Sequence, residues 1–172
     1  MIISLIGFMA AGKTEVGKSL SKRLEYPFID LDSYIEEKNN LKVSKIFELK
    51  GEKYFRKQEN ESLKEILIKY NNLVLSPGGG IILKQKNIDL LKENTTPFLL
   101  KAAPQTIIDR IDDIRERPLL NKNNPISIIK KLLKERGKYY NQFNNVIKTD
   151  DKTIEQIVDL IICKLKNTYT DF

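Results

Sequence analysis

The sequence opens on a short apolar run followed by a glycine-bounded loop, and this pattern restricts the possible fold more than any other stretch. Residues 2–6 read IISLI and residues 7–14 read GFMAAGKT, which matches G-x-x-x-x-G-K-[ST] between a predicted strand and a predicted helix. In such a loop Gly7 and Gly12 let the backbone turn tightly, so that successive N–H groups converge on a phosphate. The helix beginning at Lys13 directs its positive end at the same anion. We therefore predict a nucleotide phosphate site.

The residues of this loop have separate predicted roles. Lys13 is expected to reach the β- and γ-phosphates of the nucleotide, and the Thr14 hydroxyl to coordinate Mg²⁺. The alternative interpretation is a strand-to-helix turn that binds no ligand, which the complete motif in its required context disfavours. The predicted nucleotide-binding residues of the loop are Ala10, Ala11, Gly12, Lys13, Thr14 and Glu15.

The length and charge of the chain favour one domain that binds small anions. Its 172 residues suffice for a single core, so residues 1–172 are expected to form one domain. The net charge of +7 suits anionic ligands, but the lysines are scattered rather than clustered, which argues against a nucleic-acid partner. Because the chain has no histidine, acid–base chemistry must fall to carboxylates, lysine or water.

Three features predict a cytoplasmic protein with no membrane partner. Cys163 is the only cysteine, which excludes an internal disulfide and indicates a reducing compartment. No apolar run approaches the length that spans a membrane. Met1 leads directly into the first predicted strand, which leaves no room for a signal peptide.

The arginines are informative because the chain uses so few of them. Of its 30 basic residues, 24 are lysines and six are arginines, so arginine is expected mainly where a planar, bidentate guanidinium is needed. Arg23 lies among polar residues of the first predicted helix and is expected to be a solvated surface charge. The remaining candidates for anion recognition are Arg56, Arg110, Arg115, Arg117 and Arg136.

Five short apolar strands alternate with helical segments along the chain. The strands are predicted at residues 2–6, 28–32, 73–76, 97–102 and 145–148. The long helical stretch 33–70 is expected to break near residues 39–40 and at Gly51, and Thr153 is expected to cap a final amphipathic helix. This alternation predicts a three-layer α/β sandwich around a five-stranded parallel sheet.

The second predicted strand ends in two aspartates at the edge where ligands bind. Residues i and i+2 of an extended chain face the same side, so Asp30 and Asp32 are expected to project together. Taken alone, the pair would favour a solvated helix start capped by Asp32 or Ser33. Beside a phosphate loop it favours the ligand crevice at the carboxyl ends of the strands. Because Ser76 ends the third strand, where many such enzymes have a metal-binding aspartate, Asp30 is the expected metal carboxylate.

Two further patterns point to a second ligand. Three glycines, Gly78–Gly80, follow the third strand and favour close approach of a ligand to the main chain, although a flexible surface turn is the alternative. Arg56 and Glu59 are spaced i, i+3, so the carboxylate can hold the guanidinium in one orientation.

Residues 112–124 are charged, bounded by prolines and poor in apolar side chains, which predicts a mobile lid that excludes water from the site.

Together these motifs resemble the shikimate kinases over essentially the whole chain. The segments that carry the resemblance are the loop 7–14, the D-L-D of residues 30–32, F-R-x-x-E at 55–59, G-G-G at 78–80, R-P-L-L at 117–120 and R-x-x-Y at 136–139. The resemblance implies a P-loop fold like that of the nucleoside monophosphate kinases, with a substrate-binding helical region at about 33–61 and a lid. It also implies Mg²⁺-dependent transfer of the γ-phosphoryl group of ATP to the 3-hydroxyl of shikimate, a step of aromatic amino-acid biosynthesis, and a monomer is expected.

The resemblance also assigns roles to individual residues. Asp32 matches the residue that holds the reacting hydroxyls, and Asp30 matches a carboxylate that is expected to act on the metal through water. Arg110 matches a position near the adenine base. The implied shikimate-binding residues are Asp32, Arg56, Gly78, Gly79, Gly80 and Arg136, and the implied catalytic residues are Lys13, Asp32 and the lid residue Arg117, which contacts the nucleotide phosphates.

Two alternatives and two departures bear on this interpretation. A kinase for gluconate or a nucleoside monophosphate would share the loop and lid, but would not be expected to keep the aspartate pair, Arg56 and the three glycines together. A nucleotide-switch module is disfavoured because N-K-x-D and D-x-x-G motifs are absent, residues 121–124 reading NKNN. Ala10 stands where the family often has glycine, which puts the loop dihedrals in doubt, and Pro77 removes a donor beside the three glycines.

Overall fold

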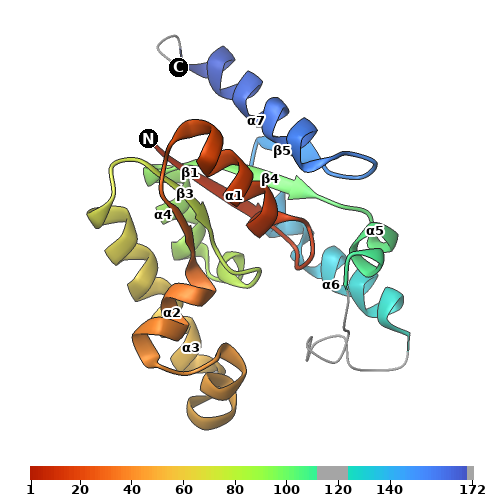
Figure 1. Ribbon diagram of the computed structural model, residues 1–172. Helices are drawn as coiled ribbons and strands as arrows, with labels where there is room; N and C mark the ends of the chain where they lie inside the picture. The colour runs from red at the N-terminus through yellow and green to blue at the C-terminus, as the bar shows by residue number, and fades with distance from the viewer. Residues whose placement is uncertain (112–123, 170–172) are drawn as a thin grey trace.

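The computed structural model describes residues 1–111 and 124–169, which contain a five-stranded sheet with helices on both faces (Figure 1). The strands are β1 (Ile2–Gly7), β2 (Phe28–Asp30), β3 (Leu73–Ser76), β4 (Thr96–Lys101) and β5 (Asn145–Lys148). Their order is β2-β3-β1-β4-β5, and every neighbouring pair is parallel. The predicted parallel α/β sandwich is therefore confirmed.

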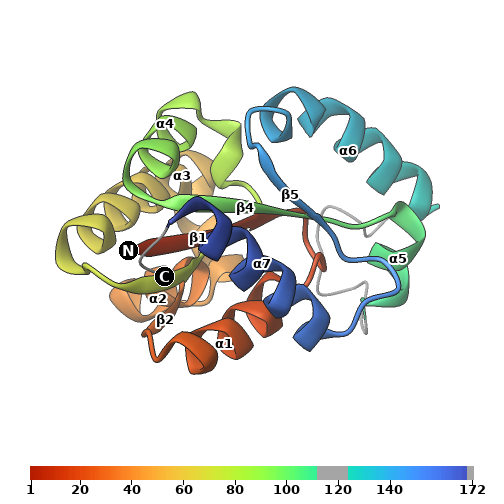
Figure 2. The same cartoon turned by 90° about the horizontal axis from the view of Figure 1, so that it is seen from above.

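The helices form two layers (Figure 2). One face of the sheet is covered by α1 (Lys13–Leu24) and α7 (Ile154–Thr168). The other face carries α2 (Leu31–Asn39), α3 (Val43–Lys69), α4 (Gln85–Asn94) and α6 (Pro125–Tyr140). The remaining described helical elements are the short helix α5 (Pro104–Asp109) and the 3-10 turn η1 (Ile81–Leu83). None of the described helices combines the length and apolarity needed to cross a membrane.

The alternation of side chains along β1 explains why the sheet has two cores. All six residues of β1 are buried. Ile3 and Leu5 pack against α1 and α7, whereas Ile2 and Ile6 pack against the helices of the opposite face. Successive residues of a strand point to opposite faces, so a central strand covered on both sides reads as a continuous apolar run. β1 is thereby held at the centre of the sheet with the phosphate loop at its carboxyl end.

The predicted breaks in the long helical stretch are confirmed. α2 ends at Asn39, and Asn40 follows in the left-handed region with a φ of 49°. Gly51 interrupts α3 with a φ of 78° and a ψ of 166°, a combination that is accessible to glycine and strained for other residues. Thr153 caps α7 as predicted, and its hydroxyl accepts a hydrogen bond from the Gln156 N–H.

The predicted end of the second strand is wrong. β2 ends at Asp30, and Asp32 lies in the first turn of α2 rather than in extended chain. The Asp30 carboxylate is the N-cap of this helix: its Oδ1 accepts from the N–H groups of Asp32 at 3.1 Å and Ser33 at 3.3 Å. Capping satisfies N–H groups that have no partner within the helix, which favours helix directly after Asp30. The cap is Asp30, not Asp32 or Ser33 as considered above.

Candidate active site

The phosphate loop connects β1 to α1, and glycine is required at its two glycine positions for different structural reasons. Gly12 is the N-cap of α1 with a φ of 94°, a left-handed conformation that favours glycine. Gly7 is not in that region. A Cβ at Gly7 would lie 2.7 Å from the Leu100 carbonyl oxygen of the adjacent strand, so glycine is needed there for close packing of β1 on β4. Of the two glycines only Gly12 is left-handed, and the turn of the loop is closed at residues 8–11, where the Ala11 N–H donates to the Phe8 carbonyl oxygen at 3.2 Å.

Ala10 also has a left-handed backbone, with a φ of 56°. This is the position at which glycine is usual in the family that the sequence resembles. A non-glycine residue in this region costs about 1 kcal/mol because its Cβ crowds the backbone. The loop therefore keeps its shape at Ala10 in spite of the side chain.

We expect Ala10→Gly to raise the free energy of unfolding by up to about 1 kcal/mol, since it removes this crowding. The gain is limited because glycine has more freedom in the unfolded chain. Ala11 is the matched control: it is fully buried and has an ordinary φ, so Ala11→Gly should destabilise the protein. Thermal denaturation of both variants measures the difference. Equal losses of stability would contradict strain at Ala10.

Lys13 and Thr14 begin α1 at the mouth of the loop. The Lys13 ammonium donates to the carbonyl oxygens of Gly7 at 3.1 Å and Phe8 at 2.9 Å, which holds it over the loop. The Thr14 hydroxyl donates to Oδ2 of Asp30 at 3.2 Å. The structure thus brings together the two side chains that the sequence suggested for a metal.

These two oxygen ligands fit Mg²⁺, which is usually bound by one or two protein oxygens together with phosphate oxygens and water. Among the described residues no group of three or more cysteines, aspartates or glutamates could hold a metal ion on its own. Thr14 and Asp30 would therefore form an incomplete site that a nucleotide phosphate completes.

A cleft of about 700 Å³ extends from the loop across the carboxyl edge of the sheet. Arg110 stands at its far end, where its guanidinium donates to the Thr149 hydroxyl at 3.0 Å and the Thr149 carbonyl at 2.7 Å. The residues that line the cleft come from the loop, from Asp30 and Asp32, from 76–79, and from the segment 152–157 that begins α7. Sequence reasoning did not include this last segment, although its position after a strand at the carboxyl edge of the sheet was a usable signal.

The half-buried Asp32 side chain lines the cleft. Its Oδ1 has no hydrogen-bond partner among the described residues. Burial, and to a lesser extent the nearby Asp30 carboxylate, raise the pKa of Asp32 to about 6 against the opposing effects of Lys13 and Arg56. A side chain at Gly78 would collide with the Asp32 carboxylate, so the first of the three glycines makes room for this group.

Arg56 is held beside Gly80 by two carboxylates. Its Nη1 donates to Oε2 of Glu59 at 2.6 Å, as the i, i+3 spacing predicted, and its Nε donates to Oε1 of Glu52 at 3.2 Å. Glu52 was missed, although it lies at i−4 on the same helix face. Glu59 is 1% exposed, and burial raises its pKa to about 7 against the opposing effect of Arg56. A Cβ at Gly80 would collide with the Arg56 guanidinium.

Arg136 reaches the same segment from α6. Its Nη1 donates to the Gly79 carbonyl at 3.1 Å, and its guanidinium lies over the Phe8 ring at 5.2 Å. The side chain is buried. Each of the three consecutive glycines therefore lies against one of the side chains expected to bind the acceptor: Gly78 against Asp32, Gly79 against Arg136 and Gly80 against Arg56.

The predicted lid falls almost entirely outside the described residues, and so do Arg115 and Arg117. Of the range 112–124 only Asn124 is described. It caps α6, with its Oδ1 accepting from the Ser127 N–H at 3.2 Å.

A family model for shikimate kinases matches residues 9–166. The chain belongs to the shikimate kinase family. A shikimate kinase of Sulfurihydrogenibium sp. (strain YO3AOP1) is 42% identical over 164 residues, which cover 95% of this chain and 97% of that protein. The shikimate kinase of Aquifex aeolicus (strain VF5) is 38% identical over 166 residues, which cover 96% of each.

Solved shikimate kinases share the whole fold. The enzyme from Acinetobacter baumannii in complex with shikimate has a TM-score of 0.91 at 32% identity and covers 97% of this chain and 93% of its own. The Aquifex aeolicus structure has a TM-score of 0.86 at 38% identity and covers 98% of both chains. A gluconokinase from Sinorhizobium meliloti 1021, at 16% identity and a TM-score of 0.57, shares the fold alone. Membership of the shikimate kinase family makes this chain a small-molecule kinase.

The raised pKa of Asp32 gives a pH prediction for this kinase. A carboxyl with a pKa of about 6 is protonated below that pH, so a step that needs the carboxylate is lost as pH falls through 6. We expect kcat/KM for the acceptor to fall along an acidic limb centred near pH 6, measured from pH 5 to 8. Glu59→Gln should retain this limb. Activity that stays level down to pH 5 would contradict the assignment to Asp32.

The same shifts have the opposite effect on stability. Asp32 and Glu59 bind protons more tightly in the folded state than in the unfolded state. Their contribution to the free energy of unfolding is therefore complete below the unfolded pKa values of 3.8 and 4.5, and is lost as pH rises through about 6 and about 7.

Proposed function

We propose that this chain transfers the γ-phosphoryl group of ATP to the 3-hydroxyl of shikimate with the help of Mg²⁺, giving shikimate 3-phosphate and ADP. The observation that carries the proposal is the pairing of each glycine in 78–80 with one side chain suited to the acceptor. One carboxylate and two guanidiniums meet the main chain there, within reach of the phosphate loop. This arrangement suits an acceptor that has both hydroxyl groups and a carboxylate.

The nucleotide half of the reaction depends on the loop and α1. The loop amides and the positive end of α1 would bind the β- and γ-phosphates, and the Lys13 ammonium would balance their charge. Mg²⁺ bound by Thr14 and, through water, by Asp30 would neutralise charge that develops on the same phosphates. Arg110 would lie beside the base at the far end of the cleft, and Arg117 would contact the phosphates from the lid.

The acceptor half depends on Asp32 and the two arginines. Arg56 and Arg136 would grip the shikimate carboxylate and so fix the ring. The Asp32 carboxylate would then accept a hydrogen bond from the 3-hydroxyl and receive its proton as the oxygen attacks the γ-phosphorus. The bond from that phosphorus to the ADP oxygen breaks in the same transfer. We propose further that the chain acts as a monomer, as its resemblance to the shikimate kinases implies.

A coupled assay of ADP formation tests the proposal. The purified chain with ATP and Mg²⁺ should turn over with shikimate and not with gluconate or a nucleoside monophosphate. Faster turnover with either of the other acceptors would replace the substrate assignment. ADP formation that no acceptor stimulates would indicate a nucleotide-binding module.

A further inference from the structure

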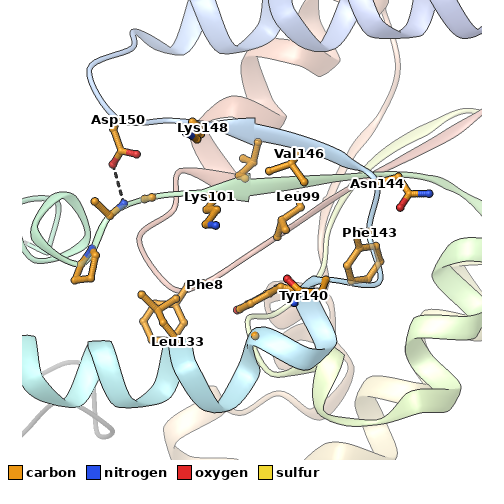
Figure 3. Close-up of a pocket in the computed structure, with 16 residues that line it drawn as sticks. Phe8, Leu99, Lys101, Leu133, Tyr140, Phe143, Asn144, Val146, Lys148 and Asp150 are labelled. Atoms are coloured by element: carbon orange, nitrogen blue, oxygen red, sulfur yellow. Dashed lines mark hydrogen bonds between the residues drawn. The ribbon is translucent and has the colours of Figure 1, made fainter.

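A second cavity, of about 730 Å³, lies on the α6 side of the sheet (Figure 3). It is bounded by β4, β5 and α6, and none of the residues that line it also lines the nucleotide cleft. Its volume is within the range of small-molecule sites, roughly 300–1,000 Å³. The proposed reaction makes no use of it.

Most of the wall is apolar. Leu99 and Val146 are paired in register on β4 and β5 and line the cavity together, as Figure 3 shows. Val146 remains 40% exposed, unusual for a valine in the middle of a strand that is covered on its other face. The other large apolar wall residues are Phe8, Leu133, Tyr140 and Phe143.

One end of the cavity is basic. Lys101 and Lys148 are paired in register on the two strands, and both line the cavity. Like charges side by side on neighbouring strands destabilise a sheet. Neither lysine has an ion-pair partner within residues 1–111 and 124–169. Two cations on neighbouring strands at the edge of an apolar cavity would attract an anionic group.

Asp150 lines the same end but is committed elsewhere. Its Oδ1 accepts hydrogen bonds from the Ala103 N–H and the Thr106 hydroxyl, both at 2.7 Å, and these bonds hold the pKa of Asp150 below its ordinary value. The carboxylate thus fastens the start of α5 to the end of β5. Because both bonds use Oδ1 and the carboxylate stays charged, this end of the cavity carries two ammonium groups against one carboxylate.

We propose that this cavity binds a small organic anion with an aromatic body. The ring would lie between the Leu99–Val146 pair and the aromatic side chains of Tyr140 and Phe143, and the anionic group would meet Lys101 and Lys148. A flat aromatic ring offers a large apolar area for its size, and a carboxylate or sulfonate oxygen accepts hydrogen bonds from both ammonium groups. The proposal does not depend on the kinase reaction.

Fluorescence titration with 8-anilinonaphthalene-1-sulfonate tests the site, because this probe joins an aromatic body to a sulfonate. The full chain is titrated with saturating ADP, Mg²⁺ and shikimate, since Phe8 and α6 also border the acceptor site. We expect one class of bound probe under these conditions. Naphthalene-2-carboxylate should displace it, and the neutral analogue 2-naphthalenemethanol should need about tenfold more.

A pair of charge reversals locates the binding. Lys148→Glu should weaken probe binding by about tenfold. Lys164→Glu changes the net charge equally on an exposed part of α7 outside the cavity, and should leave the affinity within about twofold. Equal weakening by both variants would overturn the proposal, because attraction by the overall charge would then explain the binding.

A cavity-filling variant tests the apolar part separately. Gly137 lines the cavity from α6, and a Cβ there would meet no atom within 4 Å, so Gly137→Leu can be accommodated and suits a helix. We expect this variant to keep its thermal stability and lose the probe. Binding at wild-type affinity by folded Gly137→Leu would place the probe elsewhere and refute the site.

Discussion

Lys13→Met is expected to lower kcat by about a hundredfold to a thousandfold, the loss that follows removal of one pre-positioned charge-stabilising group. The ammonium lies over the phosphate loop, held by the carbonyl oxygens of Gly7 and Phe8. In the proposed reaction, negative charge on the phosphate oxygens shifts as the transition state forms, and this cation lies close enough to stabilise it. Its loss should therefore raise the barrier more than it weakens ground-state binding.

The measurement is kcat from the coupled assay together with the dissociation constant for ADP and Mg²⁺. The affinity should change far less than kcat. Lys22→Met is the matched control, since Lys22 is an exposed residue of the same helix and lines neither cavity. If Lys13→Met kept activity within about threefold of the wild type, the role of Lys13 in charge stabilisation would have to be withdrawn.

The sheet could be predicted from the sequence because local pattern and global fold agree. β1, β3 and β4 are apolar runs that end where the chain turns, and the helices between them require parallel connections. Gly51 and the asparagines at 39–40 marked helix breaks because their backbone preferences act locally.

Features that depend on neighbours distant in sequence could not be predicted in the same way. The close approach of Gly7 to Leu100 depends on how β1 and β4 pack, and no motif records it. The sequence pattern placed Asp32 in a strand, because Asp30 and Asp32 stand at the i, i+2 spacing of an extended chain. In the structure the Asp30 side chain caps a helix that already contains Asp32. The cavity beneath α6 depends on the distance between a helix and the sheet, which is set by the packing of Phe8, Ala102, Ile107 and Ile129.

The candidate site was predictable as a set of residues and not as a geometry. Sequence reasoning grouped Asp32, Arg56 and Arg136 through resemblance and through the scarcity of arginine. The one-to-one pairing of these side chains with Gly78, Gly79 and Gly80 emerged only from the structure. For Gly78 and Gly80 the pairing has a steric reason, because side chains there would displace Asp32 and Arg56. At Gly79 the pairing is a hydrogen bond from Arg136 to the carbonyl oxygen.

Arg56→Lys is expected to raise the KM for shikimate by at least about tenfold while the affinity for ATP without acceptor changes little. The guanidinium is oriented by Glu52 and Glu59 and leans on the rings of Phe47 and Phe55, at 5.9 and 5.3 Å. A lysine ammonium is a single point charge without the planar fork that lets a guanidinium contact two carboxylates and still present paired N–H groups to a ligand. Arg23→Lys is the control, because Arg23 forms an exposed pair with Asp159.

The methyl ester of shikimate tests the same contact from the ligand side. Esterification removes the anion that the buried guanidinium of Arg136 and the half-buried guanidinium of Arg56 are proposed to bind, a penalty of ~2–5 kcal/mol in kcat/KM. Arg56→Lys should discriminate less between acid and ester than the wild type does, since one of the two contacts is already weakened. If the wild type phosphorylated the ester as efficiently as the acid, the two arginines would have to act on something other than the acceptor carboxylate.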